Sequence, residues 1–409
     1  MASRLQGFWS SRLLFWAALV LVFSIFYNHF LHTILFVTFG IGRQIQPIED
    51  FPYACSRVYH PLLEACEDMW LDHHDRKLYA ACTTVESRQG WTPGGNKYNV
   101  SARSLTDHIA VFDIDDMDLE SGLLSPRQLK ISGYPGSLDL HGFDVHHIES
   151  TTRFWLINHK PFVDPVTGEL LDAWTVGANS TIEIFDLDKA TETLHYVKTI
   201  SSDAIISPNN LAVDADGVGI VITNDHSGKT GTFRDFDPLY GSGSLAYCRS
   251  DLGECHIADT KGRGPNGIAR SRDGLYYISQ ASAGLLTVHQ LQNGQLKKVD
   301  TIPVGYGIDN LSFDEDGVLI AAAIPDAIAI LKNFQHPHDV VAPSTILSIS
   351  PKKVDGKWEI SKAIEDSLGE KLPFSTIAVH DTRKGRMFAA GLFAPFITIC
   401  EKQDIPKSK

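Results

Sequence analysis

The sequence predicts an all-β fold, a six-bladed β-propeller preceded by an N-terminal transmembrane helix. Three observations carry this prediction. A strand-like apolar segment that opens with an oxygen- or imidazole-bearing side chain occurs six times, at intervals of roughly 40 to 75 residues, which is the scale of one four-stranded blade with loop insertions. In the best copies an Asp-Gly turn and a second strand follow, as in DADGVGIVIT, SRDGLYYIS and DEDGVLIAAA, which is the start of a β-hairpin. A long apolar run precedes all six copies.

The opening residues occupy equivalent places in the six segments. They are Glu67, His141, Asn209, Asn266, Asp309 and Ser375. The innermost strands of a propeller all run the same way along the central channel, so residues at one fixed position of each blade form a ring around it. The openings are therefore expected to face one another across the channel.

This ring predicts a central calcium site. Its oxygen donors are Glu67, Asn209, Asn266 and Asp309, with Asn310 beside them. Carboxylate and amide oxygens are hard ligands of the kind that Ca²⁺ takes and soft metals do not. Any one of these residues is more often a turn former than a ligand. The Asp-Gly turns lie at the far end of each strand, however, so the recurrence at the near end favours a metal site.

Length and charge fit one large β domain. The chain of 409 residues divides into an anchor at 1–40, a linker at 41–51, the propeller at 52–402 and a tail at 403–409. Closed β architectures commonly exceed 200 residues as one unit. The net charge is −13, and the 36 Lys and Arg residues form no cluster, which argues against binding to nucleic acid.

The N-terminal run from Leu13 to Gly40 carries no charge apart from its histidines and is long enough to span a bilayer. Arg4 and Arg12 before it predict a cytoplasmic N-terminus. A cleaved signal peptide is the alternative, but the run is longer than usual and no small-residue cleavage site follows it cleanly. We therefore expect a single-pass signal anchor with the propeller in the secretory lumen or outside the cell. The sequons at Asn99 and Asn179 are expected glycosylation sites in that compartment.

Six cysteines follow the anchor, which suggests disulfides in an oxidising compartment. Cys55 and Cys400 lie at the two ends of the propeller, so a bond between them would tie its first strand to its last. Cys248 and Cys255 flank a hairpin-sized loop and are placed to staple it. The pair Cys66 and Cys82 is either a third bridge or two buried free thiols, if HHDR is the turn between them.

Two histidines are candidate proton carriers. His141 occupies the ring position of its blade, and His159 ends the next strand, which is antiparallel to the first, so both imidazoles reach the same mouth of the channel. Such a pair can take a proton from water. The alternative is an ordinary hydrogen-bonded histidine, since the chain has 17. Covalent serine catalysis has no support, because the sequence contains no Gly-x-Ser-x-Gly elbow.

Several segments together resemble the serum paraoxonase/arylesterase family of calcium-dependent lactonases and esterases. They are CEDMW, LHGFDV, INH, STIEIFDLD, PNNLAV, TNDH, PNGIARSRDG, GIDNLSFDEDG and ITICEK, and they cover essentially all of 52–402. The resemblance implies a six-bladed propeller that hydrolyses lactones and aryl esters, with two calcium ions. It places the disulfide of the family on Cys55 and Cys400 and its histidine dyad on His141 and His159.

The resemblance also assigns the ligands of both ions. The catalytic ion would be bound by Glu67, Asn209, Asn266, Asp309 and Asn310, and the buried structural ion by Asp68, the carbonyl of Phe143 and Asn210. The family usually has Asp where Asn210 stands, so the second site loses a charge. An active-site histidine of the family falls near Ile324, which alters the pocket wall, and Trp91 looks similar to the flexible aromatic lid.

These features predict a calcium-dependent carboxylic ester hydrolase. Calcium would polarise the carbonyl of a lactone or aryl ester while a water deprotonated by His141 with His159 attacks it. Asp309 or Glu67, while also binding the metal, is the alternative base. Two alternatives stay open: a sugar-lactonase or strictosidine-synthase-like propeller enzyme, and a non-catalytic membrane-anchored propeller used for binding.

Overall fold

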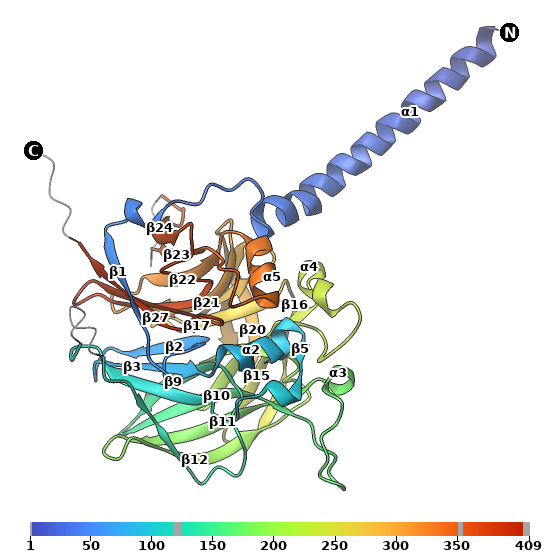
Figure 1. The fold of residues 1–409 in the computed structure, drawn as a ribbon. Coiled ribbons are helices and arrows are strands. Elements are labelled where there is room, and N and C mark those ends of the chain that lie inside the picture. The colour runs from blue at the N-terminus through green and yellow to red at the C-terminus, as the bar shows by residue number, and fades with distance from the viewer. Residues whose placement is uncertain (1, 118–123, 351–354, 404–409) are drawn as a thin grey trace, which may run out of the picture.

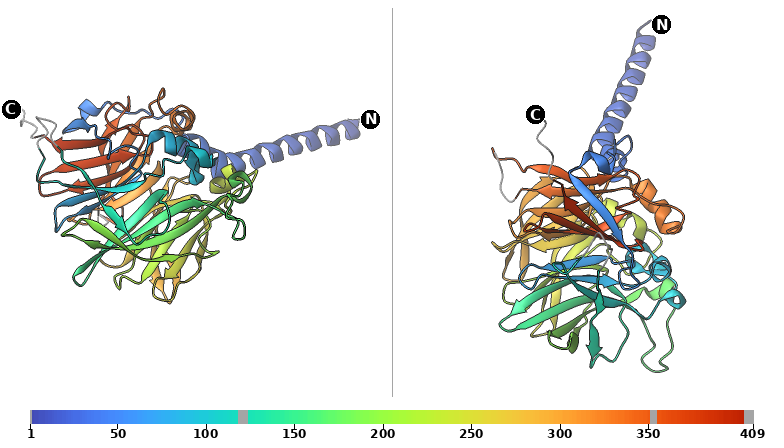
Figure 2. Two further views of the ribbon diagram at one scale, coloured as in Figure 1. Left: turned by 60° about the horizontal axis from the view of Figure 1, so that its bottom comes forward. Right: turned by 60° about the vertical axis from the view of Figure 1, so that its left-hand side comes forward.

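The computed structural model describes residues 2–117, 124–350 and 355–403. Most of its strands form six sheets of four or five strands each, arranged in a ring, which confirms the prediction of a six-bladed propeller (Figures 1 and 2). The first three blades are β2 (Asp68–Asp72), β3 (Lys77–Cys82), β6 (His108–Asp113) and β7 (Arg127–Gln128); β9 (Leu140–Ile148), β10 (Thr151–Pro161), β11 (Ala178–Asp188) and β12 (Thr193–Ile200), with β8 (Lys130–Ser132) parallel to β12; and β13 (Pro208–Val213), β14 (Gly219–Asn224), β15 (Gly243–Arg249) and β16 (Glu254–Gly262).

The remaining blades follow the same order. They are β17 (Pro265–Arg270), β18 (Leu275–Gln280), β19 (Leu285–Gln292) and β20 (Gln295–Pro303); β21 (Gly307–Phe313), β22 (Leu319–Ile324), β23 (Ser344–Ile349) and β24 (Ile360–Asp366); and β25 (Ser375–Asp381), β26 (Arg386–Gly391), β27 (Ile397–Lys402) and β1 (Tyr53–Val58). Successive inner strands contact one another around the channel, and β25 contacts β2, which closes the ring.

The predicted hairpins form where the Asp-Gly turns stand. The Gly217 amide donates to the Asp214 carbonyl at 2.9 Å between β13 and β14, and the Gly317 amide donates to the Asp314 carbonyl at 3.1 Å between β21 and β22. Gly217 has a φ of +68° and Gly317 one of +78°, conformations that glycine adopts without strain. The turn between β2 and β3 is the HHDR segment, as expected.

The first strand closes the last blade. β1 pairs antiparallel with β27, opposing Cys55 to Cys400, and a disulfide joins these two residues. The core beneath this closure is shared between blades, because Leu78 of blade 1 and Phe388 of blade 6 belong to one buried cluster. Burial of each such side chain contributes about 1.5–3 kcal/mol.

The other two disulfides settle the pairing that the sequence left open. Cys66 bonds to Cys82, so these two residues are a bridge and not free thiols, and Cys248 bonds to Cys255 across the β15–β16 hairpin. Three disulfides indicate an extracytoplasmic location, since thiols are kept reduced in the cytosol.

The predicted transmembrane helix is not found. Within the described residues, no helix is both long enough and apolar enough to cross a membrane. The run 13–40 is divided: α1 (Ala2–Phe26) projects away from the propeller, whereas the π-helices Tyr27–Leu31 and Thr33–Thr38 lie against it (Figure 1). The Thr38 hydroxyl donates to the Ser282 carbonyl at 2.7 Å, and the rings of Phe30 and Tyr240 are 6.3 Å apart. The second half of the run is therefore docked on protein.

Short elements cover the ends of the blades. They are α2 (Val85–Gly90), α3 (Ala173–Val176), α4 (Asp237–Tyr240), α5 (Ala327–Gln335), the small sheet of β4 (Trp91–Thr92) and β5 (Lys97–Tyr98), and the 3₁₀ turns Ile48–Asp50, Pro93–Gly95, Val100–Ala102 and Arg234–Phe236. Of the tail 403–409, all but Gln403 lies outside the described residues.

Candidate functional site

The ring residues stand at irregularities in the inner strands. In five blades the pairing between the first and second strand shifts register at the opening of the first strand. In blade 3 the shift lies between Pro208 and Leu211, so Asn209 and Asn210 leave the ladder, and in blade 5 it frees Asp309 and Asn310 in the same way. A bulge of this kind redirects side chains, here at one end of the channel.

The inner strands approach closely at the same level. A Cβ atom on Gly142 would lie 2.6 Å from the carbonyl oxygen of Asn209, and one on Gly267 would lie 2.4 Å from that of Asp309. Both distances are far inside van der Waals contact, so only glycine fits beside His141 and Asn266. This approach brings the ring residues of adjacent blades together.

Three buried oxygens of the ring have no hydrogen-bond partner within the described part of the chain. They are Oε2 of Glu67, Oδ1 of Asn209 and Oδ1 of Asn266. The other oxygen of Glu67, Oε1, accepts from Nδ2 of Asn310 at 2.8 Å. Buried polar atoms in native proteins are nearly always paired, so unpaired oxygens on three blades favour a partner from outside the chain, either water or a cation.

The carboxylates of the ring are crowded and buried. Burial raises the pKa of Glu67 to about 7, against the opposing charge of Arg88 and the hydrogen bond from Asn310. Burial, and then the charges of Glu67 and Asp68, raise the pKa of Asp309 well above its usual value. Two acidic groups in one buried site favour an added positive charge.

These residues fit a calcium ion. They offer carboxylate and amide oxygens from four blades, which is the donor set that a hard cation takes. Among the described residues, no group of three or more His, Cys, Asp or Glu side chains is arranged to hold a metal ion. The ring differs from such a group because the amides of Asn209 and Asn266 are half of its four ligand side chains. Asn310 is not a free ligand, since its Nδ2 donates to Glu67 and its Oδ1 accepts from Nδ2 of Asn210, both at 2.8 Å.

The predicted second calcium site does not fit a cation. Oδ1 of Asp68 accepts from the Met69 amide at 2.9 Å, and Oδ2 accepts from the Phe143 amide at 3.1 Å and from Nδ2 of Asn210 at 3.2 Å. Oδ1 of Asn210 accepts from the Leu211 amide at 2.7 Å, so the amide group of its side chain faces Asp68. Hydrogen-bond donors already surround Asp68, and Asn210 presents to it a donor where an ion would need an oxygen.

The two predicted histidines lie together in blade 2. The rings of His141 and His159 are 5.1 Å apart, and Nε2 of His141 is 3.8 Å from Oε1 of Glu67. Nδ1 of His159 bonds to the Ser180 hydroxyl at 2.8 Å. Burial, followed by the charge of Arg88, lowers the pKa of His141 to about 3, so this imidazole stays neutral and is a weak base in these surroundings.

A cavity of about 230 Å³ opens at the ring. Its polar wall includes Glu67, His141, Asn209, Asp225, His226, Asn266 and Asp309, and its apolar wall includes Ile324, Ile330, Phe334, Phe374 and Leu392. His159 lies behind His141 and borders a separate space of about 10 Å³. Trp91, which the resemblance made a flexible lid, is 3% exposed, and its Nε1 donates to the His159 carbonyl at 2.8 Å.

Sequence reasoning missed Asp225, His226 and Arg88 as residues of the site. Asp225 and His226 follow β14 directly, and β14 pairs Asn224 with Pro208 at the opening of β13. In any antiparallel hairpin the end of the second strand lies beside the start of the first, so the residues after each second strand were a signal within reach. Arg88 lies on α2 and gave no signal, since its position depends on how that helix packs.

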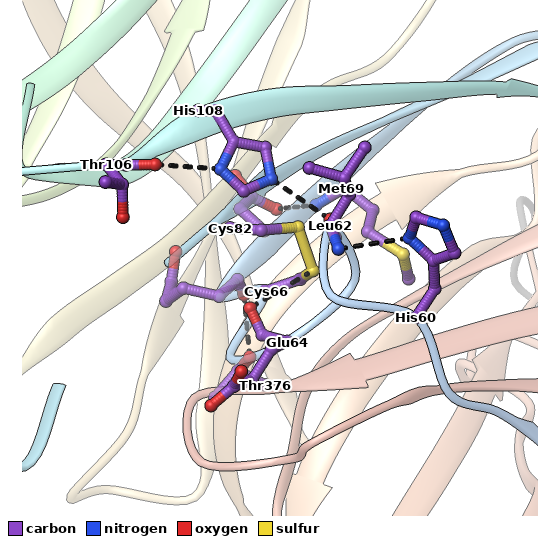
Figure 3. Close-up of a disulfide and its surroundings, with 11 residues drawn as sticks. His60, Leu62, Glu64, Cys66, Met69, Cys82, Thr106, His108 and Thr376 are labelled. Atoms are coloured by element: carbon purple, nitrogen blue, oxygen red, sulfur yellow. Dashed lines mark hydrogen bonds between the residues drawn. A yellow bond between two sulfur atoms is a disulfide. The ribbon is translucent and has the colours of Figure 1, made fainter. Parts of the chain in front are cut away.

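The Cys66–Cys82 disulfide adjoins the ring residue Glu67 in the chain, and Figure 3 shows this bridge with its surroundings. Cys66 directly precedes Glu67, whose amide donates to the Ala81 carbonyl at 3.1 Å, and the Thr376 hydroxyl donates to the Glu67 carbonyl at 2.6 Å. Beside the bridge, His108 bonds to the carbonyls of Thr106 and Leu62 at 2.9 and 3.1 Å. Glu67 is thus fixed on both sides.

The asparagines of the three sequons differ in solvent exposure. Asn99 is exposed and Asn179 is half-buried at the start of β11, so both remain predicted glycosylation sites. Asn310 also heads a sequon, but it is fully buried in the ring.

Comparison with known proteins returned likenesses to solved structures only. No family model and no curated protein matches the chain. A putative gluconolactonase is 12% identical with a TM-score of 0.48, over 88% of this chain and 97% of that one. A gluconolactonase from Xanthomonas campestris is 15% identical with a TM-score of 0.49, over 88% and 94%. The calcium-binding protein regucalcin from Agrobacterium tumefaciens is 14% identical with a TM-score of 0.45, over 87% and 97%.

At these identities and scores the likenesses carry no argument about the chemistry of this chain. None of the three is described as a paraoxonase, so the resemblance to that family stays a prediction.

Proposed function

We propose that the protein is a calcium-dependent hydrolase of carboxylic esters, with lactones and aryl esters as its substrates. The observation that carries the proposal is the convergence of three unpaired buried oxygens, from Glu67, Asn209 and Asn266, on a cavity that His141 also borders. The apolar wall of the cavity suits the hydrocarbon part of such a substrate. Its volume of about 230 Å³ suits a small one.

The residues of the chain divide the work of hydrolysis. Glu67, Asn209, Asn266 and Asp309 would hold one calcium ion, which supplies Lewis-acid polarisation of a carbonyl when bound. Asn310 positions Glu67, because its Nδ2 donates to Oε1 of that residue at 2.8 Å. His141 borders the cavity and is the group that takes the proton of the attacking water, and Glu67, 3.8 Å from its Nε2, would offset the resulting charge. His159 lies behind His141, with 5.1 Å between the two rings. The apolar wall limits access of bulk water to the reacting carbonyl.

We further propose that the propeller works outside the cytoplasm, in the secretory lumen or the extracellular space. All six cysteines are bonded in pairs, and the sequon residue Asn99 is exposed. An oxidising compartment is where three such bonds persist.

The test combines metal content with turnover. Purified protein should contain calcium and hydrolyse γ- and δ-lactones and phenyl acetate, and chelation should abolish turnover until calcium is restored. Asn266→Ala and Asp309→Ala should each lower calcium affinity and remove activity even at high calcium, because a lost ligand also misplaces the ion. Asp251→Ala, in the exposed β15–β16 turn, is the matched control and should change neither.

Other outcomes separate the alternatives. Turnover confined to sugar lactones would favour a sugar lactonase. A calcium-loaded protein that hydrolyses neither lactones nor phenyl acetate would favour a non-catalytic binding propeller. Full turnover of Asp309→Ala with normal calcium content would refute the assigned site.

A further inference from the structure

A second histidine with a carboxylate partner borders the cavity from blade 3. Asp225 and His226 directly follow β14, whose last residue, Asn224, pairs with Pro208 next to the ring residue Asn209. Both side chains line the same cavity as His141 and the ring oxygens, and each residue is 7% exposed. The imidazoles of His141 and His226 therefore approach one cavity from adjacent blades.

A buried chain of hydrogen bonds holds the pair. Nδ1 of His226 lies 2.7 Å from Oδ1 of Asp225, and the same oxygen accepts from the Ser207 hydroxyl at 2.5 Å. Arg234 extends the chain, since its Nη2 donates to the Ser207 hydroxyl at 2.7 Å, and its guanidinium lies 4.0 Å from Asp225. Arg234 is 3% exposed. A buried cation next to Asp225 keeps that carboxylate ionised.

This arrangement fixes the tautomer of His226. An ionised carboxylate only accepts hydrogen bonds, so Nδ1 of His226 carries the proton that Asp225 accepts. Nε2 makes no hydrogen bond to any described residue. It is the nitrogen left to meet a molecule in the cavity, and the carboxylate behind the ring stabilises the imidazolium that forms when Nε2 gains a proton.

We propose that His226, oriented by Asp225, is a catalytic residue that delivers a proton to the leaving oxygen of the substrate. This inference rests on the proposed ester hydrolysis and adds to it a group for the second half of the reaction. His226 is a catalytic residue because it faces the cavity, whereas Asp225 is a positioning residue because it acts through His226.

The protons of one hydrolysis balance when both imidazoles take part. Water forms a bond to the carbonyl carbon and loses one proton to His141. His226 enters the next step as the imidazolium, having taken a proton from solvent at Nε2. The bond from that carbon to the leaving oxygen then breaks, and the leaving oxygen keeps both electrons and takes the proton from Nε2 of His226. His226 is then neutral again, and His141 returns one proton to solvent. One water is consumed, and the products are the carboxylic acid and the alcohol, joined in one molecule when the substrate is a lactone.

The experiment varies the need of the leaving group for a proton. Nitrophenolate leaves without protonation, whereas an alkoxide does not, so 4-nitrophenyl acetate, phenyl acetate, ethyl acetate and δ-valerolactone form a graded series. His226→Asn keeps a donor in the place of Nδ1 and removes Nε2. We expect its kcat/KM to fall by about 100-fold or more for ethyl acetate and the lactone, and by less than about 10-fold for 4-nitrophenyl acetate. Asp225→Asn should also lose more kcat/KM on ethyl acetate and the lactone than on 4-nitrophenyl acetate, but the difference between these losses should be smaller than for His226→Asn.

Controls separate this role from a structural one. His195→Asn, on the exposed face of β12, should leave all four substrates unchanged. Calcium content and melting temperature of each variant show whether the ring is intact, and His226→Gln replaces His226→Asn if the latter does not fold. Equal losses across the series in a folded, calcium-loaded variant would overturn the role of His226 alone. A wild-type protein inactive on every ester would instead overturn the proposed function and this inference with it.

Discussion

The side-chain amide of Asn210 donates a hydrogen bond to the carboxylate of Asp68, with 3.2 Å between Nδ2 and Oδ2. The same nitrogen donates to Oδ1 of Asn310 at 2.8 Å. A single amide group thus bridges two residues that were expected to belong to two calcium sites. The donor lies between these two oxygens, and it links Asp68 to the ring residue Asn310.

The first prediction is therefore that the protein binds one calcium ion per chain and that Asn210→Asp lets it bind two. The substitution replaces the donor by a second carboxylate oxygen facing Asp68, which a cation can then bridge. Calcium titration of chelated protein by calorimetry measures the number of ions. Asn210→Ala is the control: it should bind no second ion and lose about 1–3 kcal/mol of stability, because Asp68 loses a buried partner. Two ions in the wild-type protein would contradict this prediction.

The second prediction concerns the bridge beside Glu67. Replacing Cys66 and Cys82 by serine should weaken calcium binding by roughly 10-fold, since the backbone on one side of the ligand loses its tether. The matched control replaces Cys248 and Cys255 by serine. Their disulfide joins the two strands of an outer hairpin of blade 3, remote from the ring. This replacement should lower the melting temperature without changing calcium affinity. Equal effects of both pairs on calcium affinity would show that Glu67 does not depend on its neighbouring bridge.

The third prediction concerns the N-terminal segment. Arg43 donates to the carbonyls of Pro325 and Gly305 at 3.0 and 2.6 Å, and its guanidinium lies 4.0 Å from the centre of the Tyr306 ring. A chain that begins at Tyr27 should therefore keep the melting temperature of the full protein. A chain that begins at Pro47 should melt several degrees lower.

Differential scanning calorimetry of the two truncated chains and of full-length Arg43→Ala tests this prediction. We expect Arg43→Ala to cost about 2 kcal/mol, because it removes hydrogen bonds from a charged donor. If the chain beginning at Pro47 were as stable as the full protein, the docking of residues 27–43 would contribute nothing to the fold.

The sequence predicted the blades well because their signals are local. Hairpin turns such as that at Gly217 and strand openings such as Asn209 need only a few neighbouring residues to be recognised, and the structure places both where the pattern indicated. The ring of oxygens followed from the fold, because equivalent positions in repeated blades must meet at the channel.

The features that the sequence did not predict depend on contacts between distant segments. The apolar run 13–40 fits a membrane span by hydropathy alone, yet its second half contacts Ser282 and Tyr240. The donor role of Asn210 depends on Asp68, which is far away in the chain. Local patterns carry no information about such partners.

The last prediction concerns acid stability where the first and last blades meet. Arg76, in the turn between β2 and β3, donates from Nη1 and Nη2 to both oxygens of Asp381 at the end of β25, each at 2.7 Å. Burial alone would raise the pKa of Asp381, but the hydrogen bonds and charge of Arg76 outweigh it and hold the pKa below its usual value. A carboxyl whose pKa is lowered in the folded state stabilises the protein above its unfolded pKa and loses that contribution as the pH falls through the folded value.

Asp381→Asn should accordingly lower stability by about 2 kcal/mol at pH 7, and the gap from the wild type should close below about pH 4. Thermal melts followed by circular dichroism at pH 7, 5 and 3 measure this gap. The control is Asp186→Asn, which removes an equally well-formed but more exposed pair with Arg153 and should change the melting temperature little at any pH. A gap for Asp381→Asn that stays constant from pH 7 to pH 3 would show that Arg76 acts on this junction by packing and not by charge.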